Sequence, residues 1–156
     1  MHAHQTLITN FYTAFQRRDH ASMAAAYTPD ARFSDPVFPD LRGARIGGMW
    51  RFLCEGGSDL QIMFSDVHAD DEVGRAHWEA TYSFGRRRVH NIIDASFTFE
   101  DGRIATHTDQ FDLKRWMHMA LGPAGLALGW LPPVQGLLRR QVGNQLDRFC
   151  EKRGIG

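Results

Sequence analysis

Apolar side chains recur at helical spacing near the start of the chain. Leu7, Phe11 and Phe15 share one face of the first segment, and this spacing predicts a helix. Arg17 and Arg18 follow directly, and their positive charges suit the carboxyl end of a helix dipole. The first predicted element is therefore a helix that ends at these two arginines.

Two more helices are predicted before residue 58. Asp19 is placed to cap a short helix over residues 20–27, because its carboxylate can accept backbone N–H groups. In the third helix the apolar positions fall at i, i+3, i+4 and i+7, and these are Ile46, Met49, Trp50 and Leu53. Gly56 and Gly57 are expected to end it.

From residue 59 to residue 113 the hydrophobic period changes to two. Four alternating runs, near 60–64, 78–84, 93–99 and 104–113, are separated by short polar turns, and Asp101-Gly102 is a strong hairpin signal. An earlier run over residues 31–38 also alternates, and Pro36 makes it an edge strand or breaks it. The pattern predicts an antiparallel meander.

The last part of the chain returns to a helical pattern. A short helix over residues 114–121 is expected to stop at Gly122 and Pro123. A longer amphipathic helix follows, whose predicted packing face is Val134, Leu137, Leu138, Gln141, Val142, Leu146 and Phe149. The order of elements predicts an α+β fold with helices on one face of a strongly bent antiparallel sheet. Residues 1–113 would form the main domain, with residues 114–156 as a helical extension packed on it.

Composition and charge narrow the class of protein. Hydrophobic residues make up 43% of the 156 residues and charged residues 23%, as in globular domains. Eighteen basic residues balance 18 acidic ones, so net charge argues against a nucleic-acid or anionic-membrane partner. Only two cysteines occur, no signal peptide is evident, and no apolar run is long enough to span a bilayer. We therefore expect a cytoplasmic protein without integral membrane association.

Three sequence segments resemble a known family. They are residues 27–37 (YTPDARFSDPV), residues 41–43 (LRG) and residues 97–104 (FTFEDGRI). Together they resemble the NTF2-like superfamily, in the branch of ketosteroid isomerase and SnoaL-like polyketide cyclases. The resemblance implies a cone-shaped α+β fold, a hydrophobic pocket and a homodimer paired sheet to sheet. It is specific for the fold and weak for the activity, because this fold hosts many functions.

The functional positions of ketosteroid isomerases transfer only in part. The resemblance places Asp35, directly before Pro36, at the position of the general base. The tyrosine of the oxyanion hole falls on Phe11, while Tyr12 is one residue away and is expected to point elsewhere. The protonated aspartate falls on Asp94, which is out of phase with the inward face of its strand. One clear match among three positions argues against steroid isomerisation itself.

His107 and Asp109 form the most informative polar pair. On a strand they share one face with Phe111. When the chain is aligned with the family through residues 102–104, this face resembles the one that lines the cavity of the family. Such a pair can act in acid/base catalysis, in which the Asp orients the imidazole and the His moves the proton. Alternatively, the two side chains satisfy each other inside the sheet.

Asp35 is the second candidate acid or base. Phe33 and Val37 flank it on the same predicted face, and burial among apolar groups would raise its pKa. Alternatively, it is a turn residue whose side chain caps the loop before Pro36. We expect Asp35, His107 and Asp109 to converge in space.

Several other side chains are candidates for ligand contact, with core packing as the alternative. They are Trp50, Trp78, Tyr82, Asn91 and Phe111. An inward Asn91 would orient a ligand carbonyl or satisfy a backbone group. A metal site is the rival chemistry, with His107 and Asp109 joined by His77 or His90. No metal-binding motif supports it, so we expect neither a metal nor another cofactor.

Two surface features have open interpretations. Arg86, Arg87 and Arg88 are expected to form a solvated turn rather than an anion site. Residues 122–131, which include Trp130, are expected to cover the open end of the cone or pack on a second subunit, and the alternative is an exposed lid or a membrane-surface anchor.

These features favour a cofactor-independent acid/base enzyme acting on a small hydrophobic molecule. Isomerisation, cyclisation or hydration next to a carbonyl fits the residues best, and epoxide hydrolysis is a further enzymatic reading. The alternatives are a non-catalytic module that binds a hydrophobic ligand and a dimeric assembly domain whose pocket is filled by side chains.

Overall fold

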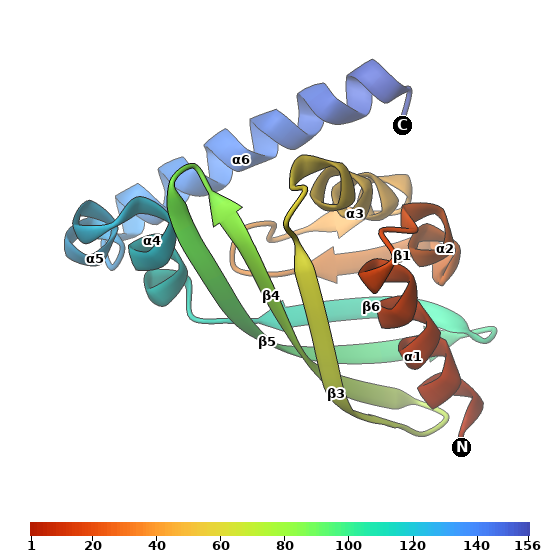
Figure 1. Ribbon diagram of the computed structural model, residues 1–156. Helices are drawn as coiled ribbons and strands as arrows, with labels where there is room; N and C mark the ends of the chain where they lie inside the picture. Colours follow the sequence, from red (N-terminus) through yellow and green to blue (C-terminus); the bar gives the residue numbers. More distant parts are fainter.

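A curved six-stranded sheet holds three N-terminal helices on its concave side, and a long C-terminal helix crosses the open end (Figure 1). The computed structural model describes residues 1–156. Its elements are α1 (Ala3–Gln16), α2 (His20–Ala25), β1 (Tyr27–Ser34), β2 (Leu41–Arg42), α3 (Ala44–Gly56), β3 (Gln61–Ala69), β4 (Val73–Phe84), β5 (Arg87–Glu100), β6 (Arg103–Gln110), α4 (Leu113–Leu121), α5 (Pro123–Leu128) and α6 (Pro132–Arg153). The predicted α+β class is confirmed.

The strand order is β2-β1-β6-β5-β4-β3. Strands β3 to β6 form the predicted antiparallel meander. Strand β1, however, pairs in parallel with β6, so the sheet is mixed and the prediction of a wholly antiparallel sheet is wrong. A short turn between two successive strands predicts that they pair antiparallel. Strands β1 and β6 are far apart in the sequence and no turn joins them, so their pairing could not be predicted in this way. Strand β1 is also not at the edge, which β2 occupies, and it ends at Ser34 before Pro36.

Capping residues set the helix boundaries. The Asp19 carboxylate accepts the Ser22 N–H at 3.1 Å, which confirms the predicted cap of α2. This helix ends at Ala25, earlier than predicted, because Tyr27 already belongs to β1. Asp112 caps α4 in the same way, so the last strand stops at Gln110 and does not reach residue 113 as the alternation suggested.

A bulge in β6 sets which of its side chains face inward. The pairing with β5 shifts between Thr98 and Phe99, so that one extra residue, Ala105, lies on the β6 side. Ile104 is buried before the bulge, and His107 and Asp109 are buried after it. Without the extra residue, Ile104 would share its face with residues 106 and 108 instead.

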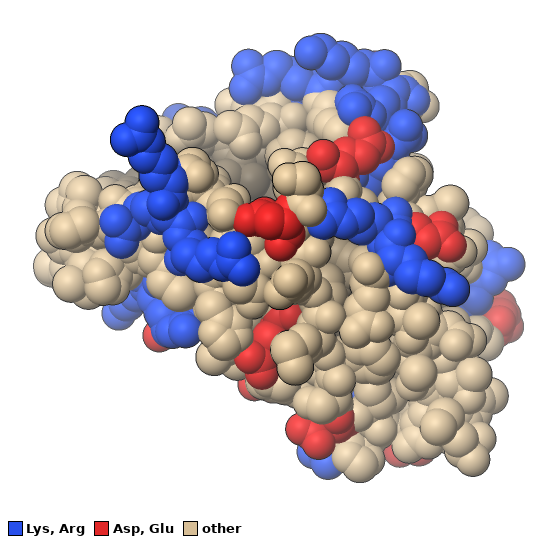
Figure 2. All heavy atoms as spheres, in the orientation of Figure 1, with Lys and Arg blue, Asp and Glu red and all other residues tan.

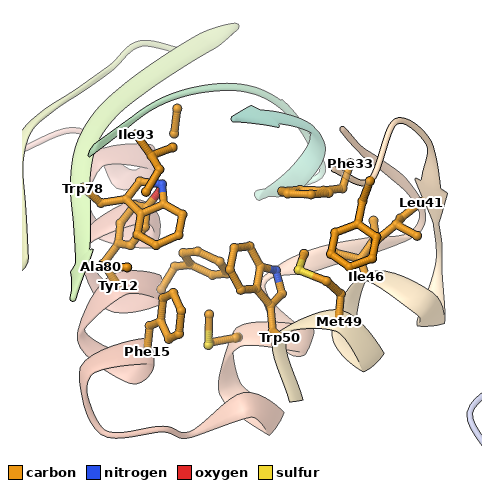
Figure 3. Packing of buried hydrophobic residues seen from close by; sticks show 14 of the residues in the cluster. Tyr12, Phe15, Phe33, Leu41, Ile46, Met49, Trp50, Trp78, Ala80 and Ile93 are labelled. Carbon is orange, nitrogen blue, oxygen red and sulfur yellow. The ribbon is translucent and has the colours of Figure 1, made fainter. Parts of the chain in front are cut away.

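Aromatic side chains fill the space between α1, α3 and the sheet (Figure 3). The rings of Phe15 and Trp50 meet edge to face at 5.1 Å between centroids, and Trp50 and Trp78 do so at 6.0 Å. Tyr12 is fully buried and stacks on Phe64 at 5.5 Å. Phe11 packs instead on Tyr27 and Trp50, so the two adjacent residues point to different parts of the interior, as expected for Tyr12.

Helix α6 is most deeply buried in its C-terminal half. Leu146 and Cys150 are buried, and a Cβ on Gly48 of α3 would lie 2.8 Å from the Cys150 sulfur, so the two helices touch closely. Most of the predicted packing face is confirmed, because Val134, Leu138 and Val142 also pack on the core. The prediction is wrong for Leu137, which is 62% exposed, and for Gln141, which is exposed as well. None of the helices combines the length and the apolar character needed to cross a bilayer.

Candidate active site

A cavity of about 290 Å³ opens between the concave face of the sheet, α3 and α6. Its wall is mostly apolar and includes Phe15, Val37, Phe38, Met49, Phe52, Leu60, Ala80, Ile93, Trp116 and Val142. No lysine, arginine or histidine lines it, and the polar side chains on the wall are few. Such a cavity suits a neutral, largely apolar molecule with one or two polar groups.

All five residues proposed for ligand contact lie on this wall. They are Trp50, Trp78, Tyr82, Asn91 and Phe111. Two of the three proposed catalytic residues, Asp35 and Asp109, lie there as well. The third, His107, does not.

Asp35 is held by the loop that follows it. Its Oδ1 accepts the N–H groups of Val37 at 2.7 Å and Phe38 at 2.6 Å, while its Oδ2 has no partner in the protein. Burial in the apolar wall raises the pKa of Asp35 to about 7, the loop N–H bonds oppose this, and the charge of Asp109 adds to it. Asp35 therefore both caps the turn and presents an oxygen with a near-neutral pKa to the cavity.

A buried chain of hydrogen bonds supports Asp109. The Trp50 indole donates to the Tyr27 hydroxyl at 2.9 Å, and that hydroxyl lies 2.7 Å from His107 Nδ1. His107 Nε2 lies 2.8 Å from Asp109 Oδ1, which also accepts the Trp78 indole N–H at 3.3 Å. Four side chains thus fix the orientation of one carboxylate.

Within this series of hydrogen bonds, only one placement of the protons gives every N–H and O–H donor an acceptor. Tyr27 accepts from Trp50 and has no other acceptor nearby, so its O–H donates to His107 Nδ1. His107 Nε2 then carries a proton and donates it to Asp109. The imidazole is therefore neutral, which agrees with its surroundings. The rings that pack on it include Phe33 at 5.0 Å and Phe97 at 4.3 Å.

His107 is a positioning residue in this arrangement. Its side chain has no exposed surface, and both ring nitrogens are engaged by Tyr27 and Asp109. The expected division of roles is thus reversed, because the His orients the Asp and the Asp reaches the cavity. His107 does not touch the cavity, so direct proton transfer between His107 and a ligand has no support in this geometry.

Two uncharged donors, Tyr82 and Asn91, also lie on the wall. The Trp116 indole donates to the Tyr82 hydroxyl at 2.7 Å, and the Tyr82 proton itself has no acceptor in the protein. Burial raises the pKa of Tyr82, the Trp116 bond opposes this, and the charge of Asp35 adds to it, so the hydroxyl stays protonated. Asn91 is 8% exposed and its carboxamide bonds to no protein group. Both side chains can donate to an oxygen in the cavity.

The rival metal site is not assembled. His77 and His90 point outward from β4 and β5, where both contact Glu79, and His77 also contacts Asp94. The sheet separates these side chains from His107, so the proposed metal-ligand set is wrong. No group of three or more His, Cys, Asp or Glu side chains is arranged to hold a metal ion. Asp94 is exposed on the outer face, as its phase predicts.

Sequence reasoning missed two members of the site. Tyr27 was only part of a motif, and its partnership with His107 depends on the parallel pairing of β1 with β6. Trp116, the donor to Tyr82, lies on α4, beyond the strand pattern. The sequence held no signal for the role of Trp116, because the burial of its indole N–H and its acceptor both follow from the tertiary fold.

Comparison with known proteins identifies the fold. The family model of the SnoaL-like domain matches residues 8–107. An LEH-like epoxide hydrolase of M. tuberculosis is 22% identical, with a TM-score of 0.63 over 80% of this chain and 94% of its own. TerC co-crystallized with polyporic acid is 14% identical, with a TM-score of 0.66 over 77% and 99%.

A third similar structure comes from Catenulispora acidiphila. This hypothetical protein, with a ketosteroid isomerase-like fold and in complex with trimethylamine, is 11% identical, with a TM-score of 0.65 over 81% of this chain and 97% of its own. No functionally curated protein matches the chain. At these identities the similar structures establish the shared fold alone.

Proposed function

This chain belongs to the SnoaL-like domain family, and on that premise we propose that it is a cofactor-independent acid/base enzyme. Its substrate would be a small, neutral, hydrophobic molecule with an enolisable carbon next to a carbonyl group. Isomerisation would then follow from movement of a proton between carbons. Cyclisation would follow from attack of the enolate carbon on a second carbonyl carbon of the same molecule, whose oxygen takes the proton.

One observation carries this proposal. Asp35 offers a partner-free carboxylate oxygen to an apolar cavity, and its pKa is about 7. A base with this pKa is half ionised at neutral pH and becomes an equally competent acid once it has taken a proton. The anchored Oδ1 limits rotation of the carboxylate, which keeps Oδ2 directed at the ligand.

The proposed reaction balances with the residues on the wall. Asp35 Oδ2 takes the proton from the carbon next to the carbonyl, and the electron pair of that C–H bond moves into an enolate. Tyr82 and Asn91 donate hydrogen bonds to the enolate oxygen, which stabilises the developing charge. The proton then returns from Asp35 to another carbon and regenerates the carboxylate.

Asp109 would orient the substrate in this scheme. Its Oδ1 is occupied by His107 and Trp78, whereas its Oδ2 has no protein partner. A fixed acceptor of this kind suits a hydroxyl group of the ligand. Among proteins of this fold, TerC was co-crystallized with polyporic acid, which is consistent with a cavity for small organic molecules.

Deuterium exchange tests the proton-transfer step for any ketone, whichever product the full reaction forms. A panel of neutral cyclic and aryl ketones would be incubated with the protein in D₂O, and deuterium at the carbon next to the carbonyl followed by NMR. We expect Asp35→Asn to lower the exchange rate at least about 100-fold. The amide oxygen of Asn can still accept from Val37 and Phe38, so the loop should survive.

A matched control uses an aspartate outside the cavity. Asp30 is exposed on β1 and makes no side-chain hydrogen bond, so Asp30→Asn should exchange at the wild-type rate. The acid/base proposal is wrong if no ketone in the panel exchanges, or if Asp35→Asn exchanges as fast as Asp30→Asn.

Epoxide hydration is a second candidate, favoured by the two carboxylates on one wall. In this reaction Asp109 accepts a proton from water, the water oxygen bonds to an epoxide carbon, and the C–O bond breaks. Protonated Asp35 donates to the epoxide oxygen, giving a diol. One protein of this fold is an LEH-like epoxide hydrolase, although the identity of 22% carries only the fold.

The pH dependence separates the two reactions. Ketone exchange needs ionised Asp35, so its rate should rise with pH up to about 7 and then level off. Epoxide opening needs protonated Asp35, so its rate should fall above about 7. A protein that binds apolar ligands in the cavity and catalyses neither reaction is a binding module.

A further inference from the structure

Large apolar side chains are exposed together at one end of the molecule. We call them the apolar cap, and they are Leu121, Leu126, Leu128, Trp130 and Leu137, which are 44%, 60%, 47%, 59% and 62% exposed. They lie on α4, α5, α6 and the turns between them. None of α5 lines the cavity, so the expectation that residues 122–131 cover the open end of the cone is wrong.

The segment that carries the cap has no acidic residue. Residues 113–146 contain no Asp or Glu, although the chain has 18 of them in 156 residues. The same segment contains Lys114, Arg115, Arg139 and Arg140. The neutral net charge therefore hides a strongly uneven distribution, and it cannot exclude an anionic partner for this end of the molecule.

The β4–β5 turn adds further positive charge beside the cap. Arg87 donates to the Met119 carbonyl at 2.8 Å, and its guanidinium lies against Gly122, where α4 meets α5. Arg86 is exposed and has no carboxylate partner. Figure 2 shows the α5 end of the molecule as tan side chains bordered by blue ones.

The cap is held in place by close packing between its helices. A Cβ on Gly125 of α5 would lie 2.1 Å from the Met117 carbonyl oxygen of α4, so only glycine permits this approach. Arg139 of α6 donates to the Pro36 carbonyl at 2.7 Å, which ties the long helix to the rim of the cone. The exposed apolar side chains of the cap therefore project from helices that are packed firmly on the rest of the fold.

We propose that the apolar cap docks on the surface of an anionic lipid bilayer. Leucine and tryptophan side chains would enter the boundary between head groups and acyl chains, and the neighbouring arginines would contact the lipid phosphates. Tryptophan is favoured at this depth because its ring is apolar and its N–H can still reach water or a head group. The protein would lie on the membrane and not cross it.

A second copy of this chain fits the cap less well. In a two-fold dimer the same patch faces itself, so the basic residues around one cap would meet those around the other. No acidic side chain within residues 113–146 is available to compensate that repulsion. An anionic bilayer supplies both an apolar interior and the opposite charge.

The elements of the cap also border the cavity. Trp116 of α4 and Val142 of α6 line the cavity wall, and Leu121 and Leu137 belong to the same two helices. Docking would therefore bring the cavity close to a reservoir of apolar molecules. The docking proposal stands on the cap alone and does not depend on the reaction proposed above.

Vesicle flotation tests the proposal with the full chain. The probes are vesicles of phosphatidylcholine alone and of phosphatidylcholine mixed with phosphatidylglycerol. We expect binding to the mixed vesicles that weakens as salt rises above about 0.1 M, because salt screens the arginine–phosphate attraction. Leu126→Ser with Trp130→Ser should weaken binding roughly tenfold or more. The double variant Arg86→Glu with Arg140→Glu should weaken binding to the mixed vesicles at least about fivefold for each basic residue replaced.

Matched variants at other exposed positions provide the control. Met63→Ser removes a side chain that is 70% exposed on β3, and Arg103→Glu changes the charge of the β5–β6 turn. Both should bind like the wild type. Quenching by brominated lipids should reach Trp130, because the other three tryptophans are buried.

Three results would each overturn the proposal. The first is no preference for vesicles that contain phosphatidylglycerol. The second is equal binding by the cap variants and the controls. The third is a dimer in sedimentation that Leu126→Ser with Trp130→Ser dissociates, since a second copy would then cover the cap.

Discussion

The Tyr27 hydroxyl lies 2.7 Å from His107 Nδ1, across the parallel pair formed by β1 and β6. This contact links two segments 80 residues apart and determines which nitrogen of the imidazole carries the proton. Through His107 it also determines how the Asp109 carboxylate faces the cavity. The Tyr27 hydroxyl therefore links the parallel pairing of β1 and β6 to the orientation of the Asp109 carboxylate in the cavity.

Tyr27→Phe should destabilise the protein. It leaves the Trp50 N–H and His107 Nδ1 without partners in a buried region, at a cost of about 1–3 kcal/mol in the free energy of unfolding. Urea denaturation would measure the change. Equal stability of wild type and variant would show that the hydrogen-bond chain does not form in solution.

Tyr12→Phe is the matched substitution with the opposite expectation. The Tyr12 hydroxyl is buried and has no hydrogen-bond partner. Its removal takes away an unsatisfied polar group and leaves the ring stacked on Phe64, so we expect unchanged or increased stability, by up to about 1 kcal/mol. A large loss of stability would contradict this environment for Tyr12.

Asp35→Asn should change how stability depends on pH. The pKa of Asp35 is about 7 in the folded protein and about 4 in an unfolded chain, so between these values the folded state holds a proton that the unfolded state lacks. The Asp35 contribution to stability is full below pH 4 and is lost as pH rises toward 7. The stability of Asp35→Asn relative to wild type should therefore rise across this window, by up to about 4 kcal/mol, and stay constant above it.

Urea titrations at several pH values would measure this difference. Asp30→Asn again serves as the control, because Asp30 is exposed and free of side-chain bonds. A difference between Asp35→Asn and wild type that stays flat from pH 4 to 7 would contradict the raised pKa.

His107→Gln should lower turnover without moving the pH midpoint. The Gln amide can keep one of the two hydrogen bonds, so Asp109 loses its fixed orientation while Asp35 is untouched. We expect kcat to fall about 10- to 100-fold with a smaller change in KM, and the midpoint to stay near 7. Loss of the pH dependence would instead show that His107 transfers the proton.

Asn91→Leu should remove a donor to the proposed enolate. The substitution keeps a similar volume on the wall and leaves no protein group unpaired, because the Asn91 carboxamide has no protein partner. Deuterium exchange is expected to slow about 100-fold, while binding of an apolar ligand to the cavity changes little. An unchanged rate would assign stabilisation of the oxygen to Tyr82 alone.

Local periodicity explains why much of the wall could be predicted from sequence. Alternation along β4 and β5 places Trp78, Tyr82 and Asn91 on the concave face, and the structure has each of them on the cavity. These inferences depend only on which face of a strand a side chain occupies. Asp35 lies just after the end of β1 and still reaches the cavity, as its alternation with Phe33 and Val37 predicts. Asp109 follows the bulge in β6, where alternation counted from Ile104 gives the opposite face, so its inward position was expected from the family resemblance.

Long-range contacts explain what could not be predicted. The partner of His107 comes from β1, through a parallel pairing that no turn signals. The exposure of Leu137 depends on which side of α6 meets the rest of the fold, although the helix pattern looks regular. Periodicity gives the face of an element, and only tertiary packing decides whether that face meets another one.

The single extra residue in β6 has a consequence for comparing this chain with its relatives. In a regular strand after the Gly102 turn, every second residue would face inward. Because Ala105 is an extra residue, each later residue of β6 faces the side opposite to the one that this count predicts. A relative that lacks this insertion would carry its inward polar pair one position earlier. An alignment without a gap there would match an interior carboxylate with a surface residue and miss a shared chemistry.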